Sequence, residues 1–176
     1  TFIVAERSHG DTPVVGIAGD KGFCNIHVSK YLLNREIGFG RRLLEILEDE
    51  GISYEHTPSG IDNISVIMRE HQLTPDVEKR VFARIEKELE GDEIFIERDL
   101  AMVMVVGEGM NSTVGIAAKA TEAFARAEVN LEMINQGSSE VSMMFGVKAD
   151  ALDRAVQALY NTYFNSMYSI SYSNVK

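Results

Sequence analysis

An internal repeat is the feature that most constrains the fold of this chain. When the 176-residue sequence is shifted by 77 positions, the interval from Asn34 to Asn111, residues 23–68 align with residues 100–145 without a gap. The identical pairs include Asn34 with Asn111, Gly38 with Gly115, Glu45 with Glu122, Glu55 with Glu132, Gly60 with Gly137 and Ser65 with Ser142. Because the order of apolar and polar runs is also kept, the sequence predicts two copies of one supersecondary unit.

The first copy predicts the element order strand, helix, strand, strand, helix, strand. Its helices show apolar stripes at helical spacing, and its strands show apolar alternation or β-branched runs. The expected strands are 23–30, 52–57, 63–68 and 93–97, and the expected helices are 38–50 and a second one that begins at Thr74-Pro75 and ends before Gly91. This βαββαβ order is that of a ferredoxin-like unit, so the fold class is α+β.

The second copy predicts strands 100–106, 129–136 and 140–147 and helices 113–127 and 150–163, but no final strand. Strands are also expected over 1–6 and 12–18, with a turn at residues 19–22. The economical solution is that residues 14–18 complete the second sheet, so that the first unit is inserted in the second. The expected division is 1–22 for the leading strands, 23–98 and 99–164 for the two units, and 165–176 for a tail.

Charge and composition exclude several classes of function. The chain has 17 basic and 27 acidic residues, a formal charge of −10, and no basic cluster, which argues against nucleic-acid binding. The single cysteine, Cys24, and the four histidines show no metal-ligand spacing, so no metal is expected. We also expect no membrane span and no signal peptide, and hence a cytoplasmic location.

The repeated polar loops, residues 34–40 and 111–117, are the candidate sites. Each lies between an apolar strand and the start of a helix, where free backbone N–H groups and the helix dipole favour a carboxylate. The alternative for the first loop is that Gly38 and Gly40 serve only to let the chain turn.

Three stretches, VGIAGDK at 15–21, GEGM at 107–110 and VNLEMINQGSSEVS at 129–142, resemble the C-terminal regulatory region of an aspartokinase. That region is a tandem pair of ACT domains, the first inserted in the second. The resemblance implies a module that binds an end-product amino acid and inhibits the attached kinase by feedback. It covers nearly the whole chain apart from the tail.

In the resembling family the effector lies against the first strand-to-helix loop, at an interface between two first ACT domains. Carried over to this sequence, the effector-binding residues are Leu33, Asn34, Glu36, Gly38, Phe39, Gly40, Tyr54, Glu55, Ser59 and Asp62. A second site, or a surface for domain pairing, is expected at Asn111, Thr113, Gly115, Glu132, Asn135 and Gln136. Acidic residues around the first loop favour lysine as the effector, with threonine as the near alternative.

The sequence lacks the Lys-Phe-Gly-Gly-Thr nucleotide motif of the family's catalytic lobe, and no P-loop is present. We therefore expect no catalytic residues and no cofactor here, with ATP and magnesium implied only for an absent kinase lobe. A homodimer is expected through exposed strand edges. Two other readings remain open, a free-standing amino-acid sensor and a ferredoxin-like interaction domain without a ligand.

Overall fold

The computed structural model describes residues 12–165. The strand expected over 1–6 and the tail from 166 onward lie outside the described residues. Residues 21–101 form one compact unit, here called the inserted unit. The described residues on either side of it, 12–20 and 102–165, form the other, here called the split unit. The chain is thus α+β with βαββαβ units, one inserted in the other, as the repeat predicted.

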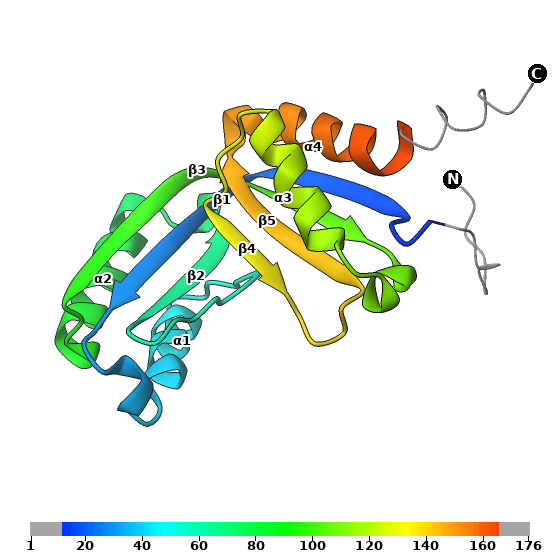
Figure 1. The fold of residues 1–176 in the computed structure, drawn as a ribbon. Coiled ribbons are helices and arrows are strands. Elements are labelled where there is room, and N and C mark those ends of the chain that lie inside the picture. Colours follow the sequence, from blue (N-terminus) through cyan, green and yellow to red (C-terminus); the bar gives the residue numbers. More distant parts are fainter. Residues whose placement is uncertain (1–11, 166–176) are drawn as a thin grey trace, which may run out of the picture. The chain divides into compact units, whose positions relative to one another are not determined.

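The inserted unit is a sheet with two helices on one face (Figure 1). It contains α1 (Phe39–Asp49), β2 (Asn63–Arg69) and α2 (Pro75–Leu89), and it shares β1 (Gly16–Ser29) and β3 (Glu93–Val106) with the split unit. Its strand order is β2-β1-β3. β1 and β2 are antiparallel, with Phe23 opposite Arg69 and Ser29 opposite Asn63.

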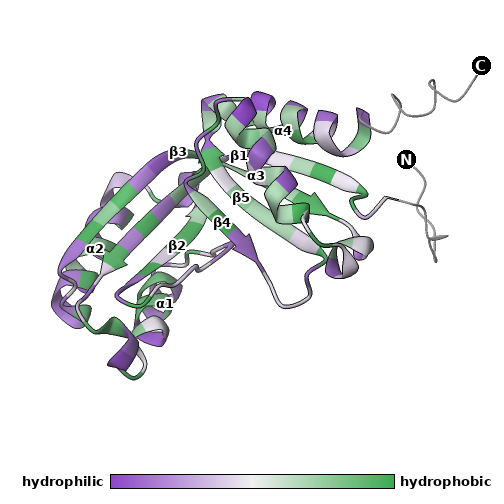
Figure 2. Ribbon diagram, in the orientation of Figure 1, coloured by the Kyte–Doolittle hydropathy of each residue, from purple (hydrophilic) through white to green (hydrophobic). Residues whose placement is uncertain are grey.

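The core of the inserted unit follows from the period of two residues in its strands and of about 3.6 residues in its helices. Alternate β1 residues Cys24, Ile26 and Val28 are buried, and in α1 the side chains of Phe39, Leu43, Ile46 and Leu47 form the buried stripe. Figure 2 shows the corresponding alternation of hydrophobic and hydrophilic residues along β1 and β3. The predicted helices therefore form where their apolar stripes have a sheet to cover.

The split unit repeats this plan. It contains α3 (Ile116–Arg126), β4 (Met133–Gln136), β5 (Ser142–Lys148), α4 (Leu152–Tyr160) and a π-helical turn (Asn161–Asn165), with the strand order β1-β3-β5-β4. Phe124 of α3 and Phe145 of β5 pack with ring centroids 4.8 Å apart in its core. The helices predicted over 113–127 and 150–163 are confirmed with shorter ends.

Two predicted breaks in strands are wrong. Residues 19–22 do not turn but continue β1, and β3 runs without interruption through Arg98 and Asp99. Gly19 packs closely under α4, because a Cβ there would lie 2.7 Å from Leu152 Cδ1. Gly22 and Asp99 have positive φ values of 86° and 57°, so each strand tolerates a local irregularity inside a ladder that long-range pairing maintains.

The strand predicted over 52–57 is also absent. Residues 56 and 59 form two isolated bridges to β2, His56 to Ile67 and Ser59 to Ile64, which share one antiparallel register. Pro58 lies between the bridges and has no N–H to donate to the ladder. The second strand of the inserted unit is thus an irregular edge rather than a regular strand.

Smaller differences concern element ends. α2 is followed by Glu90 in the left-handed conformation, with φ 52°, rather than being closed by Gly91. The strand predicted over 129–136 shortens to β4, which begins at Met133. In the described part of the chain, no helix is long and apolar enough to cross a membrane.

Candidate functional site

The first repeated loop lies between β1 and α1 in the inserted unit. It contains a 3-10 helix (Leu33–Arg35) and ends at Gly38, which caps α1 with φ 79°, a backbone conformation that favours glycine. The loop is tied to the segment before β2, because Asn34 N donates to Ile61 O at 3.0 Å and Leu32 N donates to Asp62 Oδ1 at 3.0 Å. The repeated glycine is therefore a structural requirement of the helix start.

Glu36 is the charged centre of this loop. Its carboxylate forms an ion pair with Lys30, at 2.8 Å between Oε2 and Nζ, and a second one with Arg42 through Oε1. The hydrogen bond from Lys30 is the main cause that lowers the pKa of the Glu36 carboxyl, and Arg42 acts in the same direction. Glu36 is thus ionised at neutral pH and already has two cationic partners within the chain.

The structure brings most of the predicted first-site residues together. Ser59 is opposite Ile64 at the loop end of β2, and Asp62 binds the loop directly. Leu33 and Phe39 are buried in the core, so their side chains serve packing and only their backbone groups could meet a ligand. The residues gathered at this end are Leu33, Asn34, Glu36, Gly38, Phe39, Gly40, Ser59 and Asp62.

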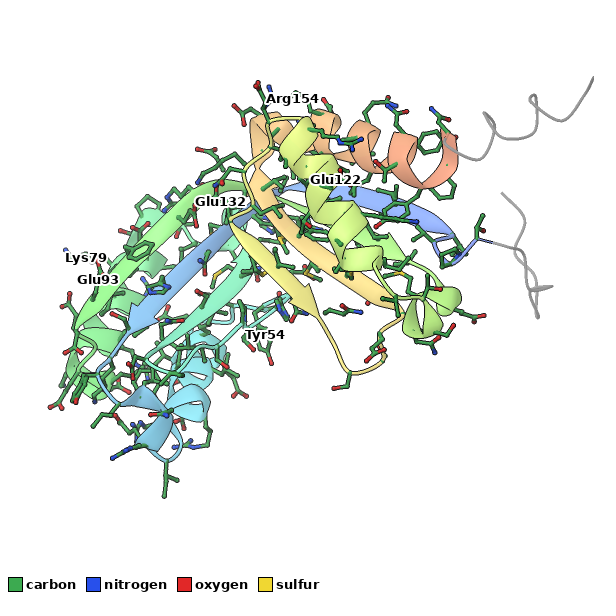
Figure 3. All side chains as sticks on the ribbon, viewed as in Figure 1. Tyr54, Lys79, Glu93, Glu122, Glu132 and Arg154 are labelled. Carbon is green, nitrogen blue, oxygen red and sulfur yellow. The ribbon has the colours of Figure 1, made fainter. Side chains whose placement is uncertain are left out.

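Tyr54 and Glu55 are placed apart from this group. Glu55 N donates to Ile67 O at 2.8 Å, and the Glu55 carboxylate is 3.5 Å from Arg69 Nε. Ile67 and Arg69 lie toward the end of β2 that is remote from the loop, roughly 15 Å along the strand at about 3.3 Å per residue. Tyr54 is half-exposed on the segment between α1 and β2 (Figure 3). Within this chain, neither residue faces the first loop.

The second repeated loop lines a pocket of about 560 Å³ in the split unit. The pocket is formed by the loop that leads into α3 and by the turn between β4 and β5. Its lining residues are Met110, Asn111, Ser112, Thr113, Val114, Gly115, Ile116, Ala117, Gln136, Gly137, Ser138 and Glu140. Both walls of the pocket therefore come from one unit.

The start of α3 gives this pocket its electrostatic character. Gly115 caps the helix with φ 90°, no side chain caps it, and the first intrahelical bond runs from Lys119 N to Gly115 O. The N–H groups of Ile116, Ala117 and Ala118 therefore have no acceptor within the helix and carry the positive end of its dipole. Gln136 and Glu140, which line the opposite wall, have side-chain oxygens that can accept hydrogen bonds.

Four of the six residues predicted for the second site line this pocket: Asn111, Thr113, Gly115 and Gln136. Asn135 does not, and Glu132 lies before the start of β4, where its N–H donates to Gly146 O at 2.9 Å (Figure 3). Gln136, which borders the pocket, is opposite Met143 at the other end of β4. Glu55 and Glu132, paired by the repeat, are thus both remote from their loops.

Several residues of the candidate sites were not predicted from the sequence, among them Lys30 and Arg42 beside the first loop and Ser138 and Glu140 in the pocket of the split unit. Lys30 and Arg42 could have been predicted in part. A lysine at the end of a strand and an arginine early in the next helix both border the loop between them. Among the described residues, no group of three or more His, Cys, Asp or Glu side chains could hold a metal ion.

Comparison with known proteins agrees with this architecture. Residues 103–163 match the family model of the ACT domain. The chain is 56% identical over 164 residues to aspartokinase 3 of Bacillus subtilis. The aligned region covers 93% of this chain and 36% of that protein. The crystal structure of Clostridium acetobutylicum aspartate kinase is similar with a TM-score of 0.82 and 40% identity, over 89% of this chain and 36% of that one.

The ligand-free regulatory subunit of Thermus thermophilus aspartate kinase shows the same fold, with a TM-score of 0.73 and 22% identity over 86% of this chain and 98% of that subunit. Fold and family match together define the chain as an ACT-domain regulatory module. It belongs with the regulatory regions of the aspartokinases. The chain spans about a third of the length of the Bacillus and Clostridium relatives.

Proposed function

We propose that this chain is the regulatory part of an aspartate kinase and that it binds an end-product amino acid to inhibit that kinase by feedback. In the whole protein, a separate catalytic lobe would use ATP and magnesium to convert L-aspartate to 4-phospho-L-aspartate. The chain alone carries none of that chemistry in this proposal. Its role is to bind the effector and favour an inactive state of the kinase.

The pocket in the split unit is the observation that carries the proposal. Its volume of about 560 Å³ lies in the range of small-molecule sites, roughly 300–1,000 Å³. The uncapped start of α3 suits the α-carboxylate of an amino acid, and the oxygens of Gln136 and Glu140 suit its ammonium group. The repeated loop of the inserted unit remains a second place for the effector.

Lysine is the favoured effector, because its side chain adds a second ammonium group that the Glu140 carboxylate could bind. Escherichia coli aspartokinase III, whose structure has 17% identity and a TM-score of 0.70 to this chain, was solved with lysine and aspartate. Threonine is the alternative, because Asn111 and Thr113 line the same pocket and could bind a hydroxyl group.

Calorimetric titration of the chain with L-lysine and L-threonine tests the proposal. We expect saturable binding of L-lysine and weaker binding of L-threonine, and Glu140→Gln should reduce lysine affinity about tenfold through loss of one charge-assisted contact. Glu132→Gln, at the remote end of β4, is the matched control and should bind as the parent does. The absence of heat and of a thermal shift with both amino acids would favour an interaction domain without a ligand.

The inserted unit's loop is tested separately. If the effector binds there with Glu55 from a second copy, Glu55→Ala should weaken binding while the protein stays folded. We further propose a homodimer, in support of which Ile37 and Val114, at matched positions of the two loops, are 95% and 99% exposed. Light scattering should then give twice the chain mass of 19.6 kDa.

A free-standing sensor without a kinase is the other candidate. A gene whose reading frame extends upstream into a nucleotide-binding motif would exclude it. Conversely, a full-length product that consists of this module alone, and that still binds L-lysine, would favour the sensor over a kinase regulatory region.

A further inference from the structure

The three charged side chains of the first loop form a compact cluster. Each oxygen of the Glu36 carboxylate has its own cation, Lys30 on Oε2 and Arg42 on Oε1. All three side chains are partly shielded, with 20% to 32% of their surface exposed. The cluster contains two cations and one anion, so without Glu36 two positive groups would face one another with no counter-charge.

Lys30 has contacts besides the one with Glu36, whereas the Arg42 guanidinium contacts Glu36. Lys30 Nζ also donates to Leu89 O at 2.7 Å, a carbonyl at the end of α2, and lies 5.9 Å from the centroid of the Phe39 ring. Arg42 is anchored in the first turns of α1, and its Nε is buried without a hydrogen-bond partner among the described residues. A lysine and an arginine that share one carboxylate are suited to bind another carboxylate in its place.

The second copy of the repeat shows the same position without this cluster. Lys30, Glu36 and Arg42 correspond to Gly107, Thr113 and Lys119, and Thr113 lines the pocket of the split unit. There the Thr113 hydroxyl donates to Gly109 O at 2.7 Å instead of reaching a cation. The first copy therefore places a carboxylate of the chain itself where the second copy borders a pocket.

We propose that Lys30 and Arg42 form a carboxylate-binding pair, and that Glu36 is an internal occupant that the α-carboxylate of an amino-acid effector replaces. The inference rests on the proposed function for the identity of the effector, but the carboxylate pair can be tested without it. The exchange conserves charge, because one carboxylate leaves the two cations as another arrives. The effector then binds this loop more weakly than it would bind Lys30 and Arg42 without Glu36, because the two carboxylates compete for the same cations.

The Glu36 carboxylate could either bind the effector directly or compete with it. A carboxylate that binds the effector's ammonium group strengthens binding, whereas an internal competitor weakens it. The sign of the effect of Glu36→Gln on affinity therefore distinguishes the two roles. Glu36→Thr, which introduces the residue type of the matched position in the second copy, is a second variant with a shorter side chain.

The first experiment measures thermal unfolding of the chain with and without sodium acetate, at constant ionic strength with chloride. Acetate should raise the unfolding temperature of Glu36→Gln and Glu36→Thr by several degrees more than that of the parent. Glu45→Gln is the matched control, because Glu45 pairs with Arg41 on the exposed side of α1. Equal acetate effects in all proteins would overturn the inference.

The second experiment titrates the same proteins with L-lysine and with L-lysinamide, which lacks the carboxylate. Glu36→Gln should bind L-lysine about fivefold more tightly than the parent, with no gain for the amide, as expected for removal of a partly exposed competing ion pair. Weaker or unchanged lysine binding would overturn the inference while leaving the proposed function intact. An acetate effect without any lysine binding would instead support the carboxylate pair and contradict the proposed function.

Discussion

The Tyr163 hydroxyl donates a 2.7 Å hydrogen bond to the backbone oxygen of Ile116, joining the π-helical turn at the end of the described chain to the first residue of α3. Tyr163 is buried, which raises the pKa of its hydroxyl to about 12. Ile116 also lines the pocket of the split unit. The turn after α4 thus fixes the start of the helix that borders the pocket.

Tyr163→Phe should lower the free energy of unfolding by about 1 kcal/mol, because one buried hydrogen bond is lost and Ile116 O retains its place in the helix. Chemical denaturation monitored by circular dichroism measures this difference. Tyr160→Phe is the control, since Tyr160 is half-exposed and packs against Phe164. Equal stability of both variants and the parent would show that the Tyr163 bond contributes nothing measurable.

Gly107→Ala should destabilise the chain more than any other alanine replacement of a glycine in the split unit. A Cβ at Gly107 would lie 1.9 Å from Pro13 O, a backbone atom that cannot move alone. We expect the free energy of unfolding to fall by about 3 kcal/mol, as for an overpacked core site. Gly137→Ala, where a Cβ would meet nothing within 4 Å, should be nearly neutral in the same denaturation experiment.

Arg98→Met, in the inserted unit, should lower the free energy of unfolding by about 1 kcal/mol. Arg98 of β3 joins Glu70 at 3.0 Å and Glu78 at 2.5 Å, so its loss leaves two carboxylates without their cation. Arg126→Met, which breaks a highly exposed pair within α3, should change stability by less than about 0.5 kcal/mol. The Arg98 effect should shrink in 0.5 M sodium chloride because salt screens it, and a salt-independent loss would point to packing instead.

Stability should depend on Cys24 at alkaline pH. Burial, together with the charge of Glu70, raises the pKa of the Cys24 thiol from 9.0 to about 11. Between these values the unfolded chain loses the thiol proton before the folded chain does, so the folded state binds more protons. The contribution of Cys24 is therefore complete below pH 9 and falls as pH rises toward 11.

The measurement compares the parent with Cys24→Ala in urea at several pH values. The stability difference between them should narrow by up to about 1.4 kcal/mol per pH unit between pH 9 and 11. Any cost of the smaller side chain is the same at every pH and cancels. A constant difference would mean that the thiol titrates equally in both states.

Much of the fold was predictable because the repeat and the apolar stripes are local signals. The start of α2 at Pro75 and the stripe of α1 followed from capping and spacing. The continuity of β1 through Gly19 and Gly22 did not, because the local residues favour a turn and only pairing with distant strands keeps them extended. Pairing of strands across the chain overrides local turn chemistry in both long strands.

The residues of the candidate sites were also predictable only in part. Loop positions such as Thr113 were identified because the repeat marks them, and they line the pocket. Glu55 was carried over from the resembling family, but the sequence does not tell which end of the strand lies near the loop within one chain. The partners of Glu36 were not predicted, because Lys30 and Arg42 come within ion-pair distance of Glu36 only when the loop is folded.

The boundaries between the two units fall inside β1 and β3, at residues 20–21 and 101–102. A chimera that exchanges the inserted unit between relatives must therefore splice two strands in mid-ladder rather than at linkers. An insertion or deletion of one residue at either splice would turn every following side chain of that strand to the opposite face of the sheet. Recombination between relatives is thus restricted to exchanges that keep the residue count of both strands.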